Sequence, residues 1–150
     1  MNRLRDERGA GLIEFALGAM VLFMIVFGVL SLCFAFYSYN VVSESAREAT
    51  RYAIVRGSAC NSFADCNITA AQLQTHIKGL GFPGINPSSL TSTTTWAAYP
   101  SGGSCQPSAA CNNPGNQVTV TVTYNFPLAI PFVPSRTLGM TNTAAMVISQ

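Results

Sequence analysis

A long stretch without ionisable residues dominates this chain and constrains what it can fold into. From Phe15 to Ser43 it contains no Asp, Glu, Lys, Arg or His. Its most apolar part, Phe15–Tyr37, would be about 35 Å long as a helix, enough to cross a hydrocarbon core of about 30 Å with a modest tilt. This apolar core is longer than that of a secretory signal peptide, and no small-x-small cleavage site follows it. The stretch therefore predicts one membrane-spanning helix.

Residues 57–150 are polar but nearly uncharged. They are rich in Ser, Thr, Asn, Gly and Pro, and their only charged residues are Asp65, Lys78 and Arg136. Such a segment can build only a small hydrophobic core, so we expect it to need covalent cross-links or a partner. The formal net charge of the whole chain is +2, and no basic run has the density of a nucleic-acid-binding surface. We therefore expect no nucleic acid partner.

The chain has five cysteines, and four of them form two closely spaced pairs outside the apolar stretch. Their polar loops contain no His, which favours disulfides over a zinc site. Pairing within each loop, Cys60 with Cys66 and Cys105 with Cys111, is the favoured connectivity, and the two crossed ones stay open. Disulfides would place these residues in an oxidising compartment; the alternative is reduced thiols in a reducing one. Cys33 is interpreted as a small apolar residue facing lipid or a neighbouring helix.

The N-terminal residues indicate how the helix is oriented in the membrane. Residues 1–8 carry three Arg against one Asp and one Glu, which predicts a cytoplasmic N-terminus by the positive-inside rule. Arg47 and Arg51 follow the other end of the span and weaken this argument, so the orientation rests equally on the cysteines. We expect a single-pass protein of the inner (cytoplasmic) membrane with its C-terminal part in the periplasm or outside the cell.

A single carboxylate, Glu14, stands at the start of the apolar stretch. An ionised acid inside a span costs about 3 kcal/mol. One interpretation is that Glu14 reaches back to the lipid headgroups. The other is that a cation is supplied at the same depth. Cleavage between Gly9 and Ala10 would free an α-amino group about one helical turn before Glu14, and between staggered helices the amine of one subunit could meet the carboxylate of another.

The residues around this acid resemble a known processing signal. The sequence RGAGLIEF at residues 8–15, followed by an apolar helix, resembles the type IVb prepilin site, where the peptidase cuts after Gly and Glu is the fifth mature residue. With SAREA at 45–49 and RYA at 51–53, it resembles the TadE-like minor pseudopilins of tight-adherence (Flp) pili. The resemblance implies that Gly9 and Ala10 flank the scissile bond, that Glu14 is the assembly carboxylate and that Phe15 completes the motif.

Local patterns predict the remaining elements. The helix is expected to continue to Arg56, with a small alanine face that packs either on the chain's own domain or on a neighbouring subunit. A capping box at Thr69 predicts a short helix over 69–79. Strands are expected at 91–99, 118–124 and 138–148, and in the second of these the valines alternate with threonines and so face one side. Prolines are expected to break the stretch 126–133.

These elements predict an α+β fold. A long N-terminal transmembrane helix continues into a small extracytoplasmic, pilin-like domain with one short helix and an antiparallel β-sheet. The expected organisation is a prepilin leader at 1–9, a transmembrane and assembly helix at 10–56, and a periplasmic, disulfide-stapled head at 57–150.

Catalysis is not expected. The only His, His76, has no acid near it in sequence and is interpreted as a surface residue. We find no paired carboxylates beyond the long helix, no glycine-rich phosphate loop and no metal-ligand cluster in the sequence. The chain is therefore expected to be no enzyme and to bind no cofactor and no metal.

The expected function is that of a minor pseudopilin in the assembly of an Flp/Tad-type adhesive pilus. The partners that this resemblance implies are a prepilin peptidase, other pilins or pseudopilins, the pilus assembly platform and inner-membrane lipid. Two alternatives stay open. The chain could be a filament-forming pilin subunit, or an unprocessed bitopic envelope protein whose periplasmic head binds a partner.

Overall fold

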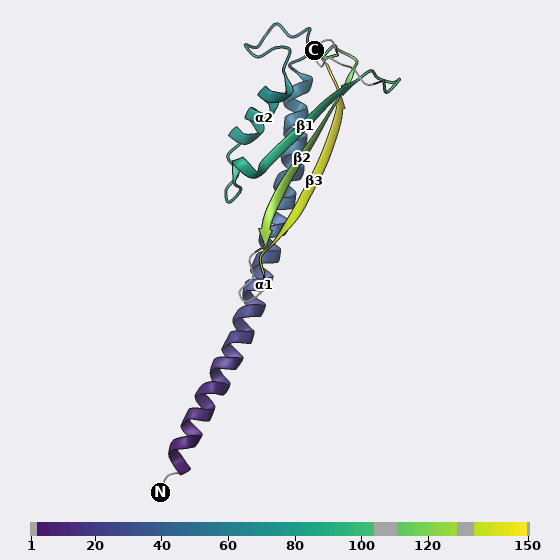
Figure 1. Ribbon diagram of the computed structural model, residues 1–150. Helices are drawn as coiled ribbons and strands as arrows, with labels where there is room; N and C mark the ends of the chain where they lie inside the picture. Colours follow the sequence, from purple (N-terminus) through teal and green to yellow (C-terminus); the bar gives the residue numbers. More distant parts are fainter. Residues whose placement is uncertain (1–2, 104–110, 129–133, 150) are drawn as a thin grey trace. The chain divides into compact units, whose positions relative to one another are not determined.

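The computed structural model describes residues 3–103, 111–128 and 134–149, with side chains described from Gly9 onward (Figure 1). The described elements, in chain order, are α1 (Arg3–Ile54), α2 (Ala70–Gly79), a short 3-10 helix η1 (Pro87–Ser89), β1 (Leu90–Ala97), β2 (Gln117–Leu128) and β3 (Arg136–Val147). The strands form one antiparallel sheet in the order β1-β2-β3. The predicted α+β fold, with one long apolar helix, one short helix and an antiparallel sheet, is confirmed.

The chain divides into two compact units. One consists of Met1–Phe36 together with Pro127–Thr137, and the other of Tyr37–Phe126 together with Leu138–Gln150. Helix α1 runs through the boundary between them at the end of the predicted membrane span. The second unit contains the small hydrophobic core.

The N-terminal part of α1 exposes large apolar side chains along its length. Phe15 is 78% exposed, and many of the apolar residues that follow it are also exposed. Contiguous apolar surface of this extent is unfavourable in water and marks a surface that contacts lipid or protein. In the part of the chain that the structure describes, this is the one helix long and apolar enough to cross a membrane.

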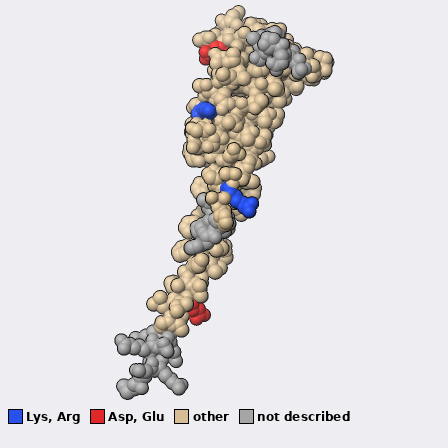
Figure 2. Space-filling model, viewed as in Figure 1, with Lys and Arg blue, Asp and Glu red and all other residues tan. Residues whose placement is uncertain are grey.

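The sheet has one buried and one hydroxyl-covered face. Strands β1 and β2 pair from Leu90 opposite Tyr124 to Trp96 opposite Val118, all four of which are buried. The threonines between them point the other way, and across β2 and β3 the hydroxyl oxygens of Thr121 and Thr143 lie 2.9 Å apart, those of Thr123 and Thr141 3.2 Å. The predicted alternation of valine and threonine is therefore confirmed. Few charged side chains appear on the face of the molecule seen in Figure 2.

The C-terminal part of α1 packs against this sheet inside the second unit. Its small face, with Ala46, Ala49 and Ala53 fully buried, contributes to the core. The Thr50 hydroxyl donates to the Ala46 carbonyl oxygen at 2.7 Å and lies 3.4 Å from the carbonyl oxygen of Ala144 on β3. Of the two predicted partners for the alanine face, the structure therefore places the chain's own sheet against it.

Helix α2 begins with the predicted capping box. The Thr69 hydroxyl accepts from the backbone N–H of Gln72, and the Gln72 side chain accepts from the backbone N–H of Thr69. Leu73 and Ile77 are buried on its inner side. Gln74 joins the helix to β1, donating to the Leu90 carbonyl oxygen at 3.0 Å and accepting from the Ser92 backbone N–H at 2.7 Å.

Several element boundaries differ from the prediction. Strand β1 spans Leu90–Ala97 rather than 91–99, and β3 spans Arg136–Val147 rather than 138–148. Helix α1 starts at Arg3, before the predicted processing bond, and ends at Ile54 rather than Arg56. Strand β2 continues through Pro127 to Leu128. This proline is tolerated because the pairing with β1 ends at Tyr124, so the missing N–H removes no hydrogen bond to that strand. Residues 129–133 of the predicted proline-broken stretch lie outside the described residues.

Candidate functional site

The predicted processing and assembly residues all lie on α1. Gly9, Ala10, Glu14 and Phe15 are exposed, and the helical repeat brings Ala10 and Glu14 to one face of the helix, about one turn apart. An exposed bond is open to a protease, and an exposed carboxylate is open to a partner. The arrangement thus leaves both the Gly9–Ala10 bond and Glu14 available to other molecules.

Glu14 is surrounded by exposed apolar side chains. Ile13 is 63% exposed and Leu17 62% exposed, so the carboxylate projects from a helix surface suited to lipid. Among the residues whose side chains the structure describes, none forms an ion pair or a hydrogen bond with Glu14. Any partner that neutralises this acid must then be lipid headgroup, water, the undescribed leader side chains or another chain.

Gly9 has no packing role in this structure. A Cβ built on it would meet no atom within 4 Å, and the same holds for Gly11. Glycine in a helix interior costs about 1 kcal/mol relative to alanine. The fold therefore gives no reason for glycine at this position.

A shallow apolar groove begins next to the acid. It encloses about 470 Å³ and is lined by Phe15, Gly18, Ala19, Leu22 and Phe23. Small residues between large ones allow a second helix to approach closely, as they do in helix pairs inside membranes.

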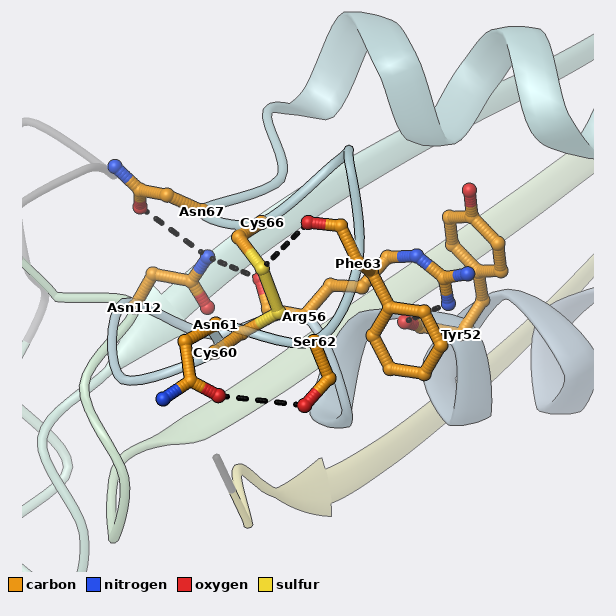
Figure 3. Close-up of a disulfide and its surroundings, with 9 residues drawn as sticks. All are labelled: Tyr52, Arg56, Cys60, Asn61, Ser62, Phe63, Cys66, Asn67 and Asn112. Atoms are coloured by element: carbon orange, nitrogen blue, oxygen red, sulfur yellow. Dashed lines mark hydrogen bonds between the residues drawn. A yellow bond between two sulfur atoms is a disulfide. The ribbon is translucent and has the colours of Figure 1, made fainter.

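A disulfide staples the loop that follows α1. Cys60 and Cys66 are bonded, with 5.4 Å between their Cα atoms (Figure 3), as predicted for the first pair. Cys111 is buried and disulfide-bonded, but Cys105 lies outside the described residues, so the predicted Cys105–Cys111 pairing stays a prediction. Cys33 is a free, exposed thiol on α1.

Asn112 ties this loop to the end of α1. It is fully buried, and its side-chain amide donates to the carbonyl oxygens of Arg56 at 3.3 Å and Ile68 at 3.4 Å. The backbone carbonyl oxygen of Asn112 accepts from the backbone N–H of Ser58 at 2.6 Å. One asparagine thus connects the helix end, the disulfide loop and the segment that follows Cys111.

Four side chains from three segments stack beside the disulfide. The Arg56 guanidinium carbon lies 3.5 Å from the Tyr52 ring centre and 4.6 Å from that of Phe63 (Figure 3). The other face of Tyr52 carries His76, with 3.7 Å between the ring centres. The prediction that His76 is a surface residue is wrong in part, since its ring is half-buried. The fold brings it onto an aromatic residue that lies far from it in sequence.

The surroundings of His76 favour its neutral form. Burial lowers its pKa below the usual value of 6.5, the Glu48 carboxylate opposes this shift, and the Arg56 guanidinium adds to it. A hollow of about 290 Å³ beside it is lined by Tyr52, Asp65, Gln72, Thr75 and His76. Asp65, which is not close to His76 in sequence, lines the same hollow from the disulfide loop. Among the described residues no group of three or more His, Cys, Asp or Glu could hold a metal ion.

Together, the exposed apolar helix and the small α+β head are consistent with a single-pass membrane protein. The model of the family described as TadE-like protein matches residues 9–51, so the N-terminal part of the chain is similar to that family. The resemblance predicted from the sequence is confirmed over α1, from the glycine before the processing bond to Arg51. The family implies a membrane protein associated with the Tad pilus, a structural rather than an enzymatic class. No curated protein and no solved structure matches the chain.

Proposed function

We propose that this protein is a prepilin-like minor pseudopilin that acts in the assembly of an Flp/Tad-type adhesive pilus. A prepilin peptidase removes residues 1–9, and Ala10 becomes the N-terminal residue. The apolar part of α1, which runs to Tyr37, stays in the inner membrane with its new N-terminus on the cytoplasmic side. The disulfide-stapled head at 57–150 lies in the periplasm and interacts with other pilins or pseudopilins and with the assembly platform.

The single observation that supports this proposal is that the Glu14 carboxylate is exposed without a partner in the part of the chain whose side chains are described. This carboxylate lies at the start of the apolar stretch of α1. A charged group at this depth is unfavourable unless it is paired. The α-amino group of Ala10 on a neighbouring, staggered helix would pair with it and would fix the register between the two helices.

The apolar groove at Gly18 supports the same arrangement. Its lining residues begin at Phe15, directly after Glu14, and the small residues Gly18 and Ala19 allow a second helix to approach closely. A helix that docks there is also close to the carboxylate. Packing at the groove and pairing at Glu14 would then act together.

Gly9 supports the processing step. No neighbouring atom requires a glycine there, and an alanine would favour the helix. Recognition by a peptidase that cuts after glycine explains the residue where packing does not.

Glu14→Val tests the proposal, with Glu14→Asp and Glu44→Gln as controls. The valine variant removes the carboxylate and leaves the amine of a partner unpaired, a loss of about 3–5 kcal/mol for a buried pair. We expect normal membrane insertion but at least a hundredfold loss of co-assembly with other pilins, measured by cross-linking in the membrane. Aspartate is expected to retain part of the assembly. Glu44 is exposed on the same helix beyond the apolar stretch, and its variant is expected to assemble normally. Normal co-assembly of Glu14→Val would contradict the role of this acid.

A further inference from the structure

The hollow beside His76 is formed within one compact unit, by side chains from three segments. Tyr52 comes from α1, Asp65 from the disulfide loop, and Gln72, Thr75 and His76 from α2. At about 290 Å³ the hollow is close to the lower limit for small-molecule sites, which is about 300 Å³. A space of this size suits a single side chain better than an extended ligand.

The side chains that line the hollow are held in place by the fold. The rings of Tyr52 and His76 stack on each other with 3.7 Å between their centres. The side-chain oxygen of Gln72 is fixed in the capping box at the start of α2. The Thr75 hydroxyl donates to the Ala71 carbonyl oxygen at 3.0 Å, which leaves its own oxygen free to accept. Because these side chains are already ordered, a ligand that enters the hollow loses little free energy in ordering them.

Asp65 brings a carboxylate to this hollow. It is exposed and directly precedes Cys66, so the bond between Cys60 and Cys66 restricts the loop that positions it. Among the residues that the structure describes, none forms an ion pair or a hydrogen bond with this carboxylate. An ionised carboxylate only accepts hydrogen bonds, and its strongest partners are the positively charged donors of lysine and arginine. The free chemical capacity of the hollow is therefore for a cation.

The charges around the hollow favour the same kind of ligand. Besides burial, which lowers the pKa of His76 most, the Glu48 carboxylate raises this pKa and the Arg56 guanidinium lowers it, so both groups act electrostatically at the hollow. The guanidinium is already engaged, since it lies over the rings of Tyr52 and Phe63 (Figure 3) and donates to the Tyr52 carbonyl oxygen. Two carboxylates against one cation leave a net negative charge around the hollow.

We propose that this hollow binds a lysine or arginine side chain that a neighbouring pilus subunit presents to the head. The ammonium or guanidinium group donates to the Asp65 carboxylate, and the Thr75 hydroxyl oxygen is a second acceptor. The aliphatic stem of the bound side chain contacts the half-buried rings of Tyr52 and His76. This site rests on the proposed function in taking the head as a contact surface for other subunits, and it names the chemistry of that contact.

Titration of the full-length protein with capped amino acids tests the site. The probes are N-acetyl-lysine methylamide and its uncharged analogue N-acetyl-norleucine methylamide, added to isotope-labelled protein in detergent micelles. We expect the lysine probe to shift the NMR signals of the Gln72 side-chain amide and of the Thr75 and His76 backbone amides, with a millimolar Kd because the probe is small. The norleucine probe is expected to leave these signals unchanged. Equal binding of the two probes, or binding of neither, would overturn the proposal.

Asp65→Asn tests the carboxylate and keeps the shape of the side chain. It is expected to weaken binding of the lysine probe by about tenfold, as for the loss of one charge-assisted hydrogen bond. Asp65 is exposed, so the variant is expected to keep the unfolding midpoint of the native head, which shows that it is folded. Glu44→Gln is the matched control, because it removes a negative charge from an exposed position of α1 outside the hollow and is expected to bind normally. Normal binding by Asp65→Asn would contradict the role of this carboxylate.

Cross-linking in the native host separates this site from the proposed function. Asp65→Asn is expected to reduce cross-links between the head and other subunits several-fold, and Glu44→Gln is expected to leave them unchanged. Loss of probe binding with unchanged cross-links would show that the hollow binds free cations, and would overturn the contact with a subunit. If the native protein assembles but does not bind the lysine probe, only the site fails. If it binds the probe but is neither processed nor assembled, the proposed function and the subunit contact fail, while the cation-binding hollow stands.

Discussion

The guanidinium of Arg56 lies over the ring of Tyr52, with 3.5 Å between its carbon and the ring centre. Tyr52 lies in the last turn of α1, and Arg56 lies just after the end of the helix. Phe63, from the disulfide loop, has its ring centre 4.6 Å from the guanidinium carbon. The stack therefore joins the end of the membrane helix to the start of the head. Its strength decides how firmly the disulfide loop is held on α1.

Replacing Arg56 tests the stack directly. Arg56→Ala is expected to lower the free energy of unfolding of the head by about 1–2 kcal/mol, because a cation between two rings loses both contacts. The measurement is chemical unfolding in detergent, followed by near-ultraviolet circular dichroism. Arg51→Ala is the control, since Arg51 is exposed on the same helix and its loss is expected to change stability by less than about 0.5 kcal/mol. Equal effects of the two variants would contradict the stack.

His76 makes the head sensitive to acid. Its pKa is lowered in the folded protein, mainly by burial, so the unfolded chain binds a proton more readily than the folded one. The stability that this neutral ring contributes is complete above pH 6.5, and is lost as the pH falls below that value toward the lower pKa of the folded state.

His76→Phe isolates this effect, because phenylalanine keeps a ring against Tyr52 and does not titrate. The native head is expected to lose stability between about pH 7 and pH 5, and the variant is expected to lose less over this range, which lies above the usual pKa values of carboxylates. Unfolding midpoints measured across this range check the difference. Parallel curves for the two proteins would show that His76 is not the titrating group.

Asn112 is expected to be the most sensitive polar residue of the head. Asn112→Ala removes the donor to the Arg56 and Ile68 carbonyl oxygens in a fully buried position. Each buried group left unpaired costs about 1–3 kcal/mol. The Ile68 carbonyl oxygen loses this donor, whereas the Arg56 carbonyl oxygen still accepts from the Ile68 backbone N–H at 3.1 Å. A loss of about 1–3 kcal/mol is therefore expected in the same unfolding measurement. Asn61→Ala, in the exposed part of the disulfide loop, is the control and is expected to have little effect.

The disulfides can be tested by peptide mapping without reduction. Linked peptides containing Cys60 and Cys66 are expected, and a second linked pair containing Cys105 and Cys111 is predicted from the sequence. Changing both Cys60 and Cys66 to Ser is expected to cost about 2 kcal/mol, as for a short closed loop. Free thiols at all four positions in protein from the native host would contradict the oxidising location of the head.

Patterns that depend on neighbours in sequence predicted much of this fold. The uncharged run gave α1, the capping box at Thr69 gave α2, and the alternation over 118–124 gave the buried face of β2. The contacts of His76 could not be predicted this way, because Tyr52, Phe63 and His76 come from three segments that meet only in the folded chain. The passage of β2 through Pro127 was also missed, since it depends on where the pairing with β1 ends.

The processing residues were identified from their own sequence pattern, and the family match begins at Gly9. Their role depends on a peptidase and on neighbouring chains, so a single folded chain contains no contact that tests it. What the structure adds is that the bond and the carboxylate are exposed, and that no packing explains the glycine.

The most direct test of the account is the N-terminal sequence of the protein purified from its native host, with and without the prepilin peptidase. The chain is expected to start at Ala10 when the peptidase is present and at Met1 when it is absent. Gly9→Leu is expected to start at Met1 in both cases, since bulk at this position blocks a peptidase that cuts after glycine. A native chain that starts at Met1 in the presence of the peptidase would contradict the account, and would favour an unprocessed membrane-anchored protein.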